Sequence, residues 1–433
     1  MNSARSMFLG FVLGMCTAAF AMDVKSPDYP SLSAAIRDCN AKGGGRVVVP
    51  KGVYELNGPI HLKSNVELHL EEGAKLVFTD DYRAYLPAVR TNWEGIDAMG
   101  YSPLVYACGC TNVAVTGKGV LAPRVEGWVP WRTPKGMGAA RKTQRGWGEN
   151  AVPLAERDLT KIEDGGFRPH LLQFLDCKGV RLEGFTIRGS PFWTIHLCRT
   201  EDAIVRNLDV SAWSESGVVM NNTDGIDIEM SRNVTVEGCT FRQNDDAIVI
   251  KAGRDREGRE RGRPCEDILI RNCTVNAGHT LLGIGSELSA GVRNVRMENC
   301  RVDCEVWRLL YIKTNPRRGG FVENITMDGV TARKVTQDVI AVSSRVYYGM
   351  PGQEVAGPNP QLTRIEGVTM RNVRCDWALR GVTLLCDPDY PARNFRLENV
   401  VVDEVFENFV RVENVDGIKL DVTANKVHPD AHW

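Results

Sequence analysis

Three aspartates in the middle of the chain have the type and spacing that acid and base catalysis requires. Asp224 precedes the adjacent pair Asp245 and Asp246 by about twenty residues, and each lies beside a short apolar, β-branched segment. Carboxyl groups held close together raise one another's pKa, so one can stay protonated while others stay ionised. The sequence therefore predicts an acid–base site, provided that the fold brings the three residues together.

A nine-residue pattern predicts how the fold does this. Its nine copies are NVAVTGKGV (112–120), GVRLEGFTI (179–187), DAIVRNLDV (202–210), NVTVEGCTF (233–241), DILIRNCTV (267–275), NVRMENCRV (294–302), NITMDGVTA (324–332), GVTMRNVRC (367–375) and NFRLENVVV (394–402). Positions 2, 4 and 9 are always apolar, and position 6 is always Gly or Asn. Alternation at positions 2 and 4 predicts a strand. The apolar alternation then moves by one residue, to positions 7 and 9, which predicts a left-handed corner at position 6.

Recurring strand, corner and strand units indicate a solenoid of stacked coils. Copies start 23 to 43 residues apart, except for one gap of 67. We therefore predict an all-β, single-stranded parallel β-helix in which equivalent positions of neighbouring coils stack about 4.8 Å apart. Cys239, Cys273 and Cys300 at position 7 should form a buried stack. The segment SLSAAIRDCNAK (31–42) should be a helix that caps the N-terminal end.

The same repeat places polar residues on consecutive coils. Asp224 lies just before the copy at 233, Asp245 and Asp246 just after it, His279 after the copy at 267, and Lys313 after the copy at 294. Adjacent residues of a flat strand point to opposite faces, so the aspartate pair can share one cleft only if the chain bends there. One acid that protonates a leaving oxygen and another that activates water would suit glycoside hydrolysis.

Four ordered motifs resemble those of glycoside hydrolase family 28, the polygalacturonases and their relatives. They are Asn222-Thr223-Asp224, Asp245-Asp246, Gly278-His279 and Tyr311-Ile312-Lys313. The resemblance extends over most of the chain after residue 21 and implies a right-handed parallel β-helix. It also implies a pectic poly- or oligosaccharide substrate that is cleaved with inversion at galacturonate-containing bonds. As a separate expectation, we predict exo action or action on oligosaccharides.

The resemblance assigns roles residue by residue. Asp245 would be the general acid, Asp224 and Asp246 would hold and deprotonate the water, and His279 would support the acid. Lys313 would bind the substrate carboxylate.

Four more residues complete the expected substrate-binding set. Asn222 belongs to the first motif, and Tyr311 stands where the family has Arg, which removes a bidentate carboxylate partner. Arg308, Arg317 and Arg318 are candidates to replace it, and we name Arg318. His196 is open to two interpretations, a cleft residue or a hydrogen-bonded structural one, and we include it in the set.

Composition and the N-terminus bound the remaining expectations. Residues 1–21 read as a signal peptide, which predicts a secreted or periplasmic protein; Cys16 leaves a lipoprotein as the less favoured alternative. Residues 22–433 should form one β-helix domain, with a long non-repeat loop at 121–170 that either packs on the solenoid or contacts sugar. The net charge of −1 argues against nucleic-acid or membrane partners. We expect a monomer, and twelve cysteines after residue 21 that act mostly as core thiols.

Three other functions stay open at this point. A rhamnogalacturonan-specific hydrolase could use the same acids, and a lyase of the same fold could hold Ca²⁺ with them. A non-catalytic carbohydrate-binding solenoid is the third. The hydrolase hypothesis requires neither cofactor nor metal.

Overall fold

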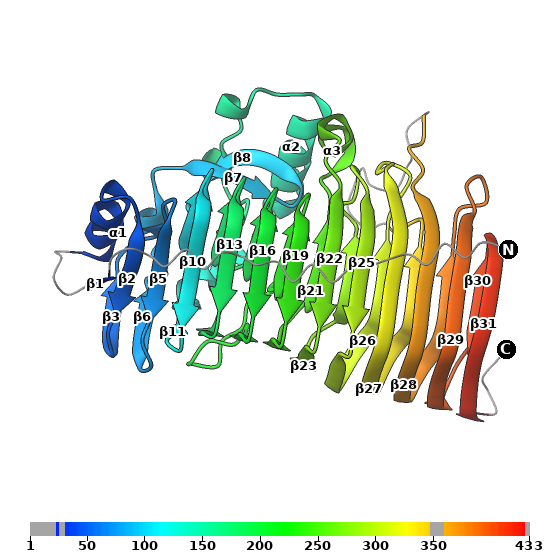
Figure 1. Cartoon of the computed structure of the whole chain (residues 1–433). Coiled ribbons are helices and arrows are strands. Elements are labelled where there is room, and N and C mark those ends of the chain that lie inside the picture. The colour runs from blue at the N-terminus through cyan, green and yellow to red at the C-terminus, as the bar shows by residue number, and fades with distance from the viewer. Residues whose placement is uncertain (1–22, 26–30, 347–358, 429–433) are drawn as a thin grey trace, which may run out of the picture.

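Short apolar strands stack coil upon coil into one elongated, right-handed parallel β-helix, as predicted (Figure 1). The computed structural model describes residues 23–25, 31–346 and 359–428, so the expected signal peptide and Cys16 lie outside the described residues. No helix within these ranges is long and apolar enough to cross a membrane.

The first two strand rows of the β-helix are formed by the two halves of the repeat. The first row consists of β1 (Asp23–Lys25), β2 (Gly45–Val49), β5 (Val66–Leu70), β10 (Thr111–Gly117), β13 (Lys178–Glu183), β16 (Glu201–Arg206), β19 (Arg232–Glu237), β22 (Cys265–Arg271) and β25 (Val292–Glu298). The second consists of β3 (Gly52–Leu56), β6 (Ala74–Phe78), β11 (Val120–Leu121), β14 (Thr186–Arg188), β17 (Asp209–Ser211), β20 (Thr240–Arg242) and β23 (Thr274–Ala277).

The third row lies outside the repeat, and we call it the third sheet. It consists of β4 (Ile60–His61), β9 (Val105–Cys108), β12 (Leu172–Leu175), β15 (Ile195–Cys198), β18 (Ile226–Glu229), β21 (Ile248–Lys251) and β24 (Thr280–Gly285). In the later coils the rows merge into longer strands: β26 (Arg301–Lys313), β27 (Phe321–Ser343), β28 (Arg364–Leu385), β29 (Ala392–Val405), β30 (Val410–Glu413) and β31 (Val415–Val427).

Left-handed corners shape every coil of the repeat. All nine residues at position 6 have positive φ, as predicted, from Gly117 at 103° to Asn299 at 50°. Position 1 has positive φ in all nine copies as well, which the sequence analysis missed. The Asn, Asp and Gly residues found there tolerate this conformation. The Asn and Asp side chains also form hydrogen bonds from coil to coil, as between Asn233 Nδ2 and Asp202 Oδ1 at 2.7 Å.

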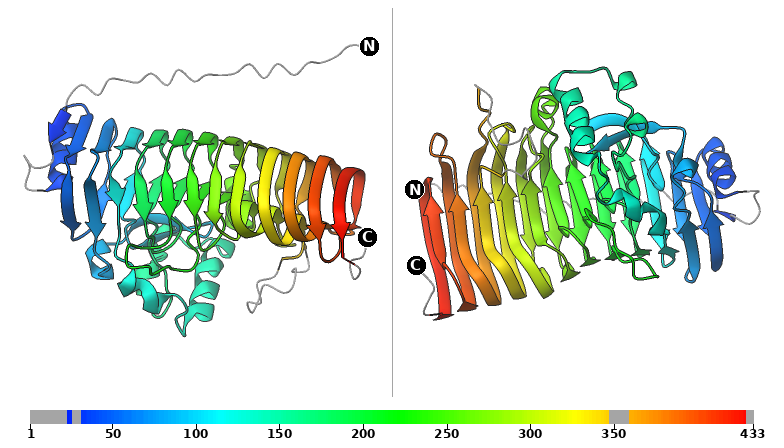
Figure 2. Two further views of the ribbon diagram at one scale, coloured as in Figure 1. Left: turned by 90° about the horizontal axis from the view of Figure 1, so that it is seen from below. Right: turned by 180° about the vertical axis from the view of Figure 1, so that it is seen from behind.

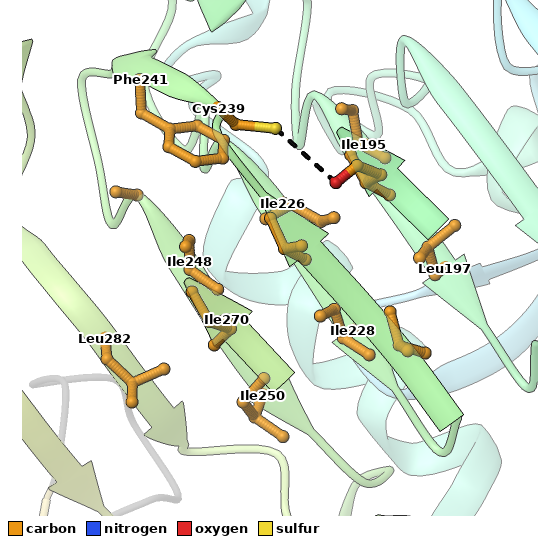
Figure 3. Close-up of a cluster of buried hydrophobic side chains, with 14 of the residues drawn as sticks. Ile195, Leu197, Ile226, Ile228, Cys239, Phe241, Ile248, Ile250, Ile270 and Leu282 are labelled. Atoms are coloured by element: carbon orange, nitrogen blue, oxygen red, sulfur yellow. Dashed lines mark hydrogen bonds between the residues drawn. The ribbon is translucent and has the colours of Figure 1, made fainter. Parts of the chain in front are cut away.

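The core consists of apolar side chains that stack at equivalent positions of successive coils. Ile195, Ile226, Ile248 and Leu282 pair in register across β15, β18, β21 and β24, and all four are fully buried (Figure 3). Burying such a side chain is worth about 1.5–3 kcal/mol. The predicted cysteine stack is buried too, and no cysteine within the described residues forms a disulfide.

The predicted N-terminal cap is helix α1 (Leu32–Ala41). The Ser31 side chain accepts a hydrogen bond from the Ala34 amide and so caps the helix, and Leu32, Ile36 and Cys39 are buried against the first coil. Exposed apolar surface at the end of the solenoid is thereby covered.

The segment at 121–170 is more structured than the predicted loop. It contains α2 (Met137–Glu149) and three short 3-10 helices, η3 (Glu126–Trp131), η4 (Leu154–Glu156) and η5 (Leu159–Lys161). Together with the antiparallel hairpin β7 (Val89–Trp93) and β8 (Ile96–Gly100) and with α3 (Asp255–Arg261), it forms a layer on one side of the β-helix (Figures 1 and 2). A further 3-10 helix, η2 (Tyr82–Tyr85), precedes the hairpin. Of the tryptophans in the segment 121–170, Trp128 is fully buried, as expected if this segment packs on the β-helix.

Gly184 tests the corner geometry. Its φ is 83°, and an added Cβ would lie 2.7 Å from the Gly117 carbonyl oxygen of the preceding coil. Gly184→Ala should lower the free energy of unfolding in urea by about 1–3 kcal/mol. The control is Gly138→Ala in α2, where a Cβ meets nothing within 4 Å, so it should cause no loss. Equal stability of the two variants would contradict this account of the corners.

Candidate active site

Two of the three aspartates occupy equivalent positions on neighbouring coils. Asp224 lies two residues before Ile226 at the start of β18, and Asp246 lies two residues before Ile248 at the start of β21; the two isoleucines pair in register. The Gly225 amide donates to the Asp246 carbonyl at 3.0 Å and fixes this alignment. Carboxylate oxygens of Asp224, Asp245 and Asp246 consequently lie within 4.8 Å of one another.

Asp245 joins this cluster because the chain bends between β20 and β21. The chain bends at residues 244 and 245, and the carboxylates of Asp245 and Asp246 both lie near that of Asp224, as the sequence analysis required. The Asp245 Oδ1 atom accepts the amide of Asp246 at 2.9 Å, and Asn222 Nδ2 lies 3.4 Å from Asp245 Oδ2. The Asp245 side chain is 24% exposed, compared with 4% for Asp246, so Asp245 is the acid that a ligand can reach.

His279 contacts Asp245 from the next coil. Its Nδ1 atom lies 3.3 Å from Asp245 Oδ1, and its amide donates to the Asp245 carbonyl at 2.8 Å. The ring stacks on Trp307 with centroids 3.6 Å apart and planes 6° from parallel. Trp307 was missed by the sequence analysis, because its only signal is an aromatic residue in a strand. By stacking on the imidazole it holds that ring beside Asp245.

Lys313 pairs with Asp246. Its Nζ atom lies 2.8 Å from Asp246 Oδ2. Burial raises the pKa of Asp246, but the attraction and hydrogen bond of Lys313 outweigh it, so the pKa lies below its usual value. Asp246 is therefore ionised at neutral pH and suited to accept a proton.

Asp224 has the opposite electrostatic environment. Burial, and then repulsion from Asp227 and Asp245, raise its pKa well above the usual value, while Lys251 partly offsets them. Asp227 is fully buried, and its pKa is raised by burial. Lys251 Nζ lies 3.8 Å from Asp227 Oδ1 and 4.6 Å from the Trp193 ring. The sequence analysis did not recognise Lys251, although this buried cation limits the repulsion among the acids.

Tyr311 lies beside Lys313 on the outer face of β26. The Lys313 ammonium is 5.4 Å from the centre of the Tyr311 ring, and the Arg308 guanidinium is 4.1 Å from it on the same strand. Arg308 is bound to Asp338, with Nε 3.2 Å from Oδ2. Its guanidinium therefore contacts an aromatic ring and a protein carboxylate.

Two of the predicted substrate-binding side chains, His196 and Arg318, are buried in the structure. His196 is fully buried; its Nε2 atom lies 2.9 Å from Glu229 Oε2, and Gln173 Nε2 lies 3.0 Å from its Nδ1. Burial also lowers the pKa of His196 to about 3, so it is a neutral structural residue. The Arg318 side chain is 3% exposed and is bonded to the Ser286 carbonyl and to Asp255. His196 is thus enclosed by protein, whereas Arg318, although almost fully buried, lines a hollow between α2 and the segment after β26.

The geometry of the trio suits one bridging water. A water hydrogen-bonds at about 2.7–2.8 Å, so one molecule can bridge two oxygens less than 4.8 Å apart. Asp224 and Asp246 could hold such a water while Asp245 protonates a leaving group. Three carboxylates this close could also hold a cation, but the Lys313 ammonium already compensates Asp246.

The three acids lie together on a right-handed parallel β-helix, and this arrangement suits acid–base hydrolysis. Comparison with known proteins identifies the family: the model for glycosyl hydrolases family 28 matches residues 151–424, and the chain belongs to this family of glycosidases.

Similar proteins include both exo- and endo-acting enzymes. A hyperthermoactive exopolygalacturonase of Thermotoga maritima has a TM-score of 0.82 and 33% identity, covering 94% of this chain and 92% of that one. An endo-polygalacturonase of Pectobacterium carotovorum is 24% identical over 77% of this chain and 81% of its own length. A probable polygalacturonase of Vitis vinifera is 26% identical over 68% of this chain, and the match spans about half, 54%, of that longer relative.

Asp227→Asn tests the electrostatics of the site. Because Asp227 raises the pKa of Asp224, removing its charge should lower that pKa. If Asp224 must be ionised to hold the water, the acidic limb of kcat/KM should move to lower pH. Asp303→Asn on the surface is the control and should leave the profile unchanged. An unmoved acidic limb in a folded Asp227→Asn variant would show that Asp224 does not govern it.

Proposed function

We propose that this glycosidase hydrolyses galacturonate-containing bonds of pectic chains from a chain end, with inversion. Hydrolysis is supported by the three clustered carboxylates, because their charge environments differ. Asp246 is held ionised by Lys313, whereas Asp245 is accessible and contacts His279. Asp245 is assigned as the general acid, and Asp246 as the group that takes the proton from water held with Asp224.

Lys313 and Tyr311 are assigned to the sugar that bears the carboxylate. The Lys313 side chain remains 14% exposed beside its partner Asp246. A phenol offers one hydrogen bond and an apolar ring face, so Tyr311 suits stacking against a sugar rather than bidentate carboxylate binding. Asn222, within 3.4 Å of Asp245, is placed to contact the same sugar pair.

Cleavage from a chain end is supported by the layer over the third sheet. The outward side chains of β12 and β15, Gln173 and His196, are completely buried. A second apolar cluster covers them, formed by Trp93, Ala98, Ala140, Leu159, Phe167, Phe192 and Trp193. Trp193 contacts Lys251 beside the acids, so the cluster extends to the edge of the acid site. A polymer crossing the acids would meet this cluster, whereas a chain end could stop against it.

Asp245→Asn should lower kcat by about 10²–10⁴-fold, because general acid catalysis contributes that much. Unfolding in urea should be unchanged, since the residue is partly exposed. Wild-type-like turnover in the folded variant would remove Asp245 from the acid role.

The anomer of the first product tests inversion. The carboxyl oxygens are closer than the roughly 6.5–9.5 Å usual for inverting enzymes, so inversion is inferred from a spacing that one bridging water would fit, not from a wide separation. Proton NMR of the earliest product should show the opposite anomer to the substrate bond. Initial retention would overturn the mechanism.

Activity should persist in excess chelator, because the proposed mechanism uses no metal. Loss of activity with rescue by Ca²⁺ would favour a lyase, which would also give an unsaturated, ultraviolet-absorbing product.

The product pattern tests action at the chain end. Polygalacturonate digested to 5% completion should give one short product and little fall in viscosity. This expectation rests on the apolar cluster that covers the outer face of β12 and β15. A ladder of oligomers with a rapid fall in viscosity would instead indicate internal cleavage. A parallel digest of rhamnogalacturonan fragments tests whether the enzyme prefers that backbone to polygalacturonate.

Export guided by residues 1–21 is also part of the proposal and is checked by locating the N-terminus of the mature protein.

A further inference from the structure

A hollow of about 530 Å³ lies between α2, the start of α3 and the segment that follows β26. Its size is within the roughly 300–1,000 Å³ of typical ligand pockets. α2 contributes Lys142 and Arg145, and the segment after β26 contributes Asn315 and Arg317. None of these residues belongs to the four family motifs of the sequence.

Basic side chains outnumber acidic ones in the lining of the hollow. Five basic side chains and two acidic ones, Glu149 and Asp255, face the hollow. Arg317 lies 3.4 Å from Glu149 and 3.9 Å from Asp255, and Arg145 lies 3.7 Å from Glu94. Two further carboxylates beside the lining also pair with its cations: Glu94 with Arg145 and Arg254, and Glu287 with Arg254 and Arg318. Burial, then repulsion from Arg254, lowers the pKa of Arg145 to about 9. An anion in the hollow would relieve this crowding.

Two residues of the lining lie close along the chain to the lysines of the acid site. Lys313, which binds Asp246, is the last residue of β26, and Asn315 follows two residues later. Consecutive Cα atoms are 3.8 Å apart, so these two residues are separated by less than about 8 Å. Arg254, also in the lining, follows Lys251 at the end of β21 by three residues. A sugar next to the one at Lys313 can therefore reach the hollow.

We propose that this hollow binds the carboxylate of a second uronate unit of the substrate, through Lys142, Arg145 and Arg317. This inference rests on the proposed function and extends it to a specificity site. Arg317 supplies the planar, bidentate guanidinium that Tyr311 cannot, and its side chain is 32% exposed. Arg308 and Arg318 are instead bound to Asp338 and Asp255.

The test compares charged and neutral substrates. Trigalacturonate and its methyl ester are assayed with wild type, Arg317→Gln, Lys142→Gln and the double variant. Losing a charge-assisted hydrogen bond should lower kcat/KM for the acid about 10- to 100-fold in the double variant. The loss should appear in KM, and the ester should change less than about twofold. The matched control is Lys334→Gln, a half-exposed cation at a hollow on another part of the β-helix, which should behave as wild type.

Each outcome decides the proposal. Unchanged KM for the acid, or equal losses on acid and ester, would overturn it. Lys142 is exposed, so its variant keeps the test valid if Arg317→Gln unfolds. A wild type inert on both substrates would mean that the proposed function has failed. Calorimetric titration of trigalacturonate then decides: weaker binding to the double variant than to wild type supports the hollow, and equal or absent binding overturns it.

Discussion

The spacing between stacked coils is the constraint on which the site depends. Parallel hydrogen bonding fixes equivalent residues of neighbouring coils about 4.8 Å apart. Asp224 and Asp246 are such equivalents, and the alignment of β18 with β21 leaves them no freedom to separate. Two carboxylates at this distance repel each other, yet it is also the distance that one water can bridge. The backbone thus creates both the electrostatic problem and its catalytic use.

Buried cations make this arrangement stable. An uncompensated ionised carboxylate in the interior would be very costly, so it must be paired or neutralised. Lys313 keeps Asp246 ionised, whereas Lys251 is shared between Asp227 and Glu287. Because the two lysines lie at the ends of different strands, the acids experience different fields. This difference permits separate roles for chemically identical side chains.

The sequence predicted the parts of the fold that repeat. Apolar positions and left-handed corners recur in every coil, so the coil, the helical cap α1 and the order of the acids could be inferred from local patterns. The corner at position 1 was missed although its residues, Asn, Asp and Gly, carried the same signal as position 6. Here the periodicity of the apolar residues drew attention to only one of two corners.

What could not be predicted depends on contacts between distant segments. His196 alternates outward along β15 like a cleft residue, and only the apolar cluster formed by residues 93–193 buries it. That cluster has no periodicity, and its members come from a hairpin, α2 and loops. The same layer limits the accessible length of the third sheet and forms one wall of the cationic hollow. The positions of the acids therefore depend on the register of the coils, whereas we propose that the choice of substrate depends on the layer attached to them.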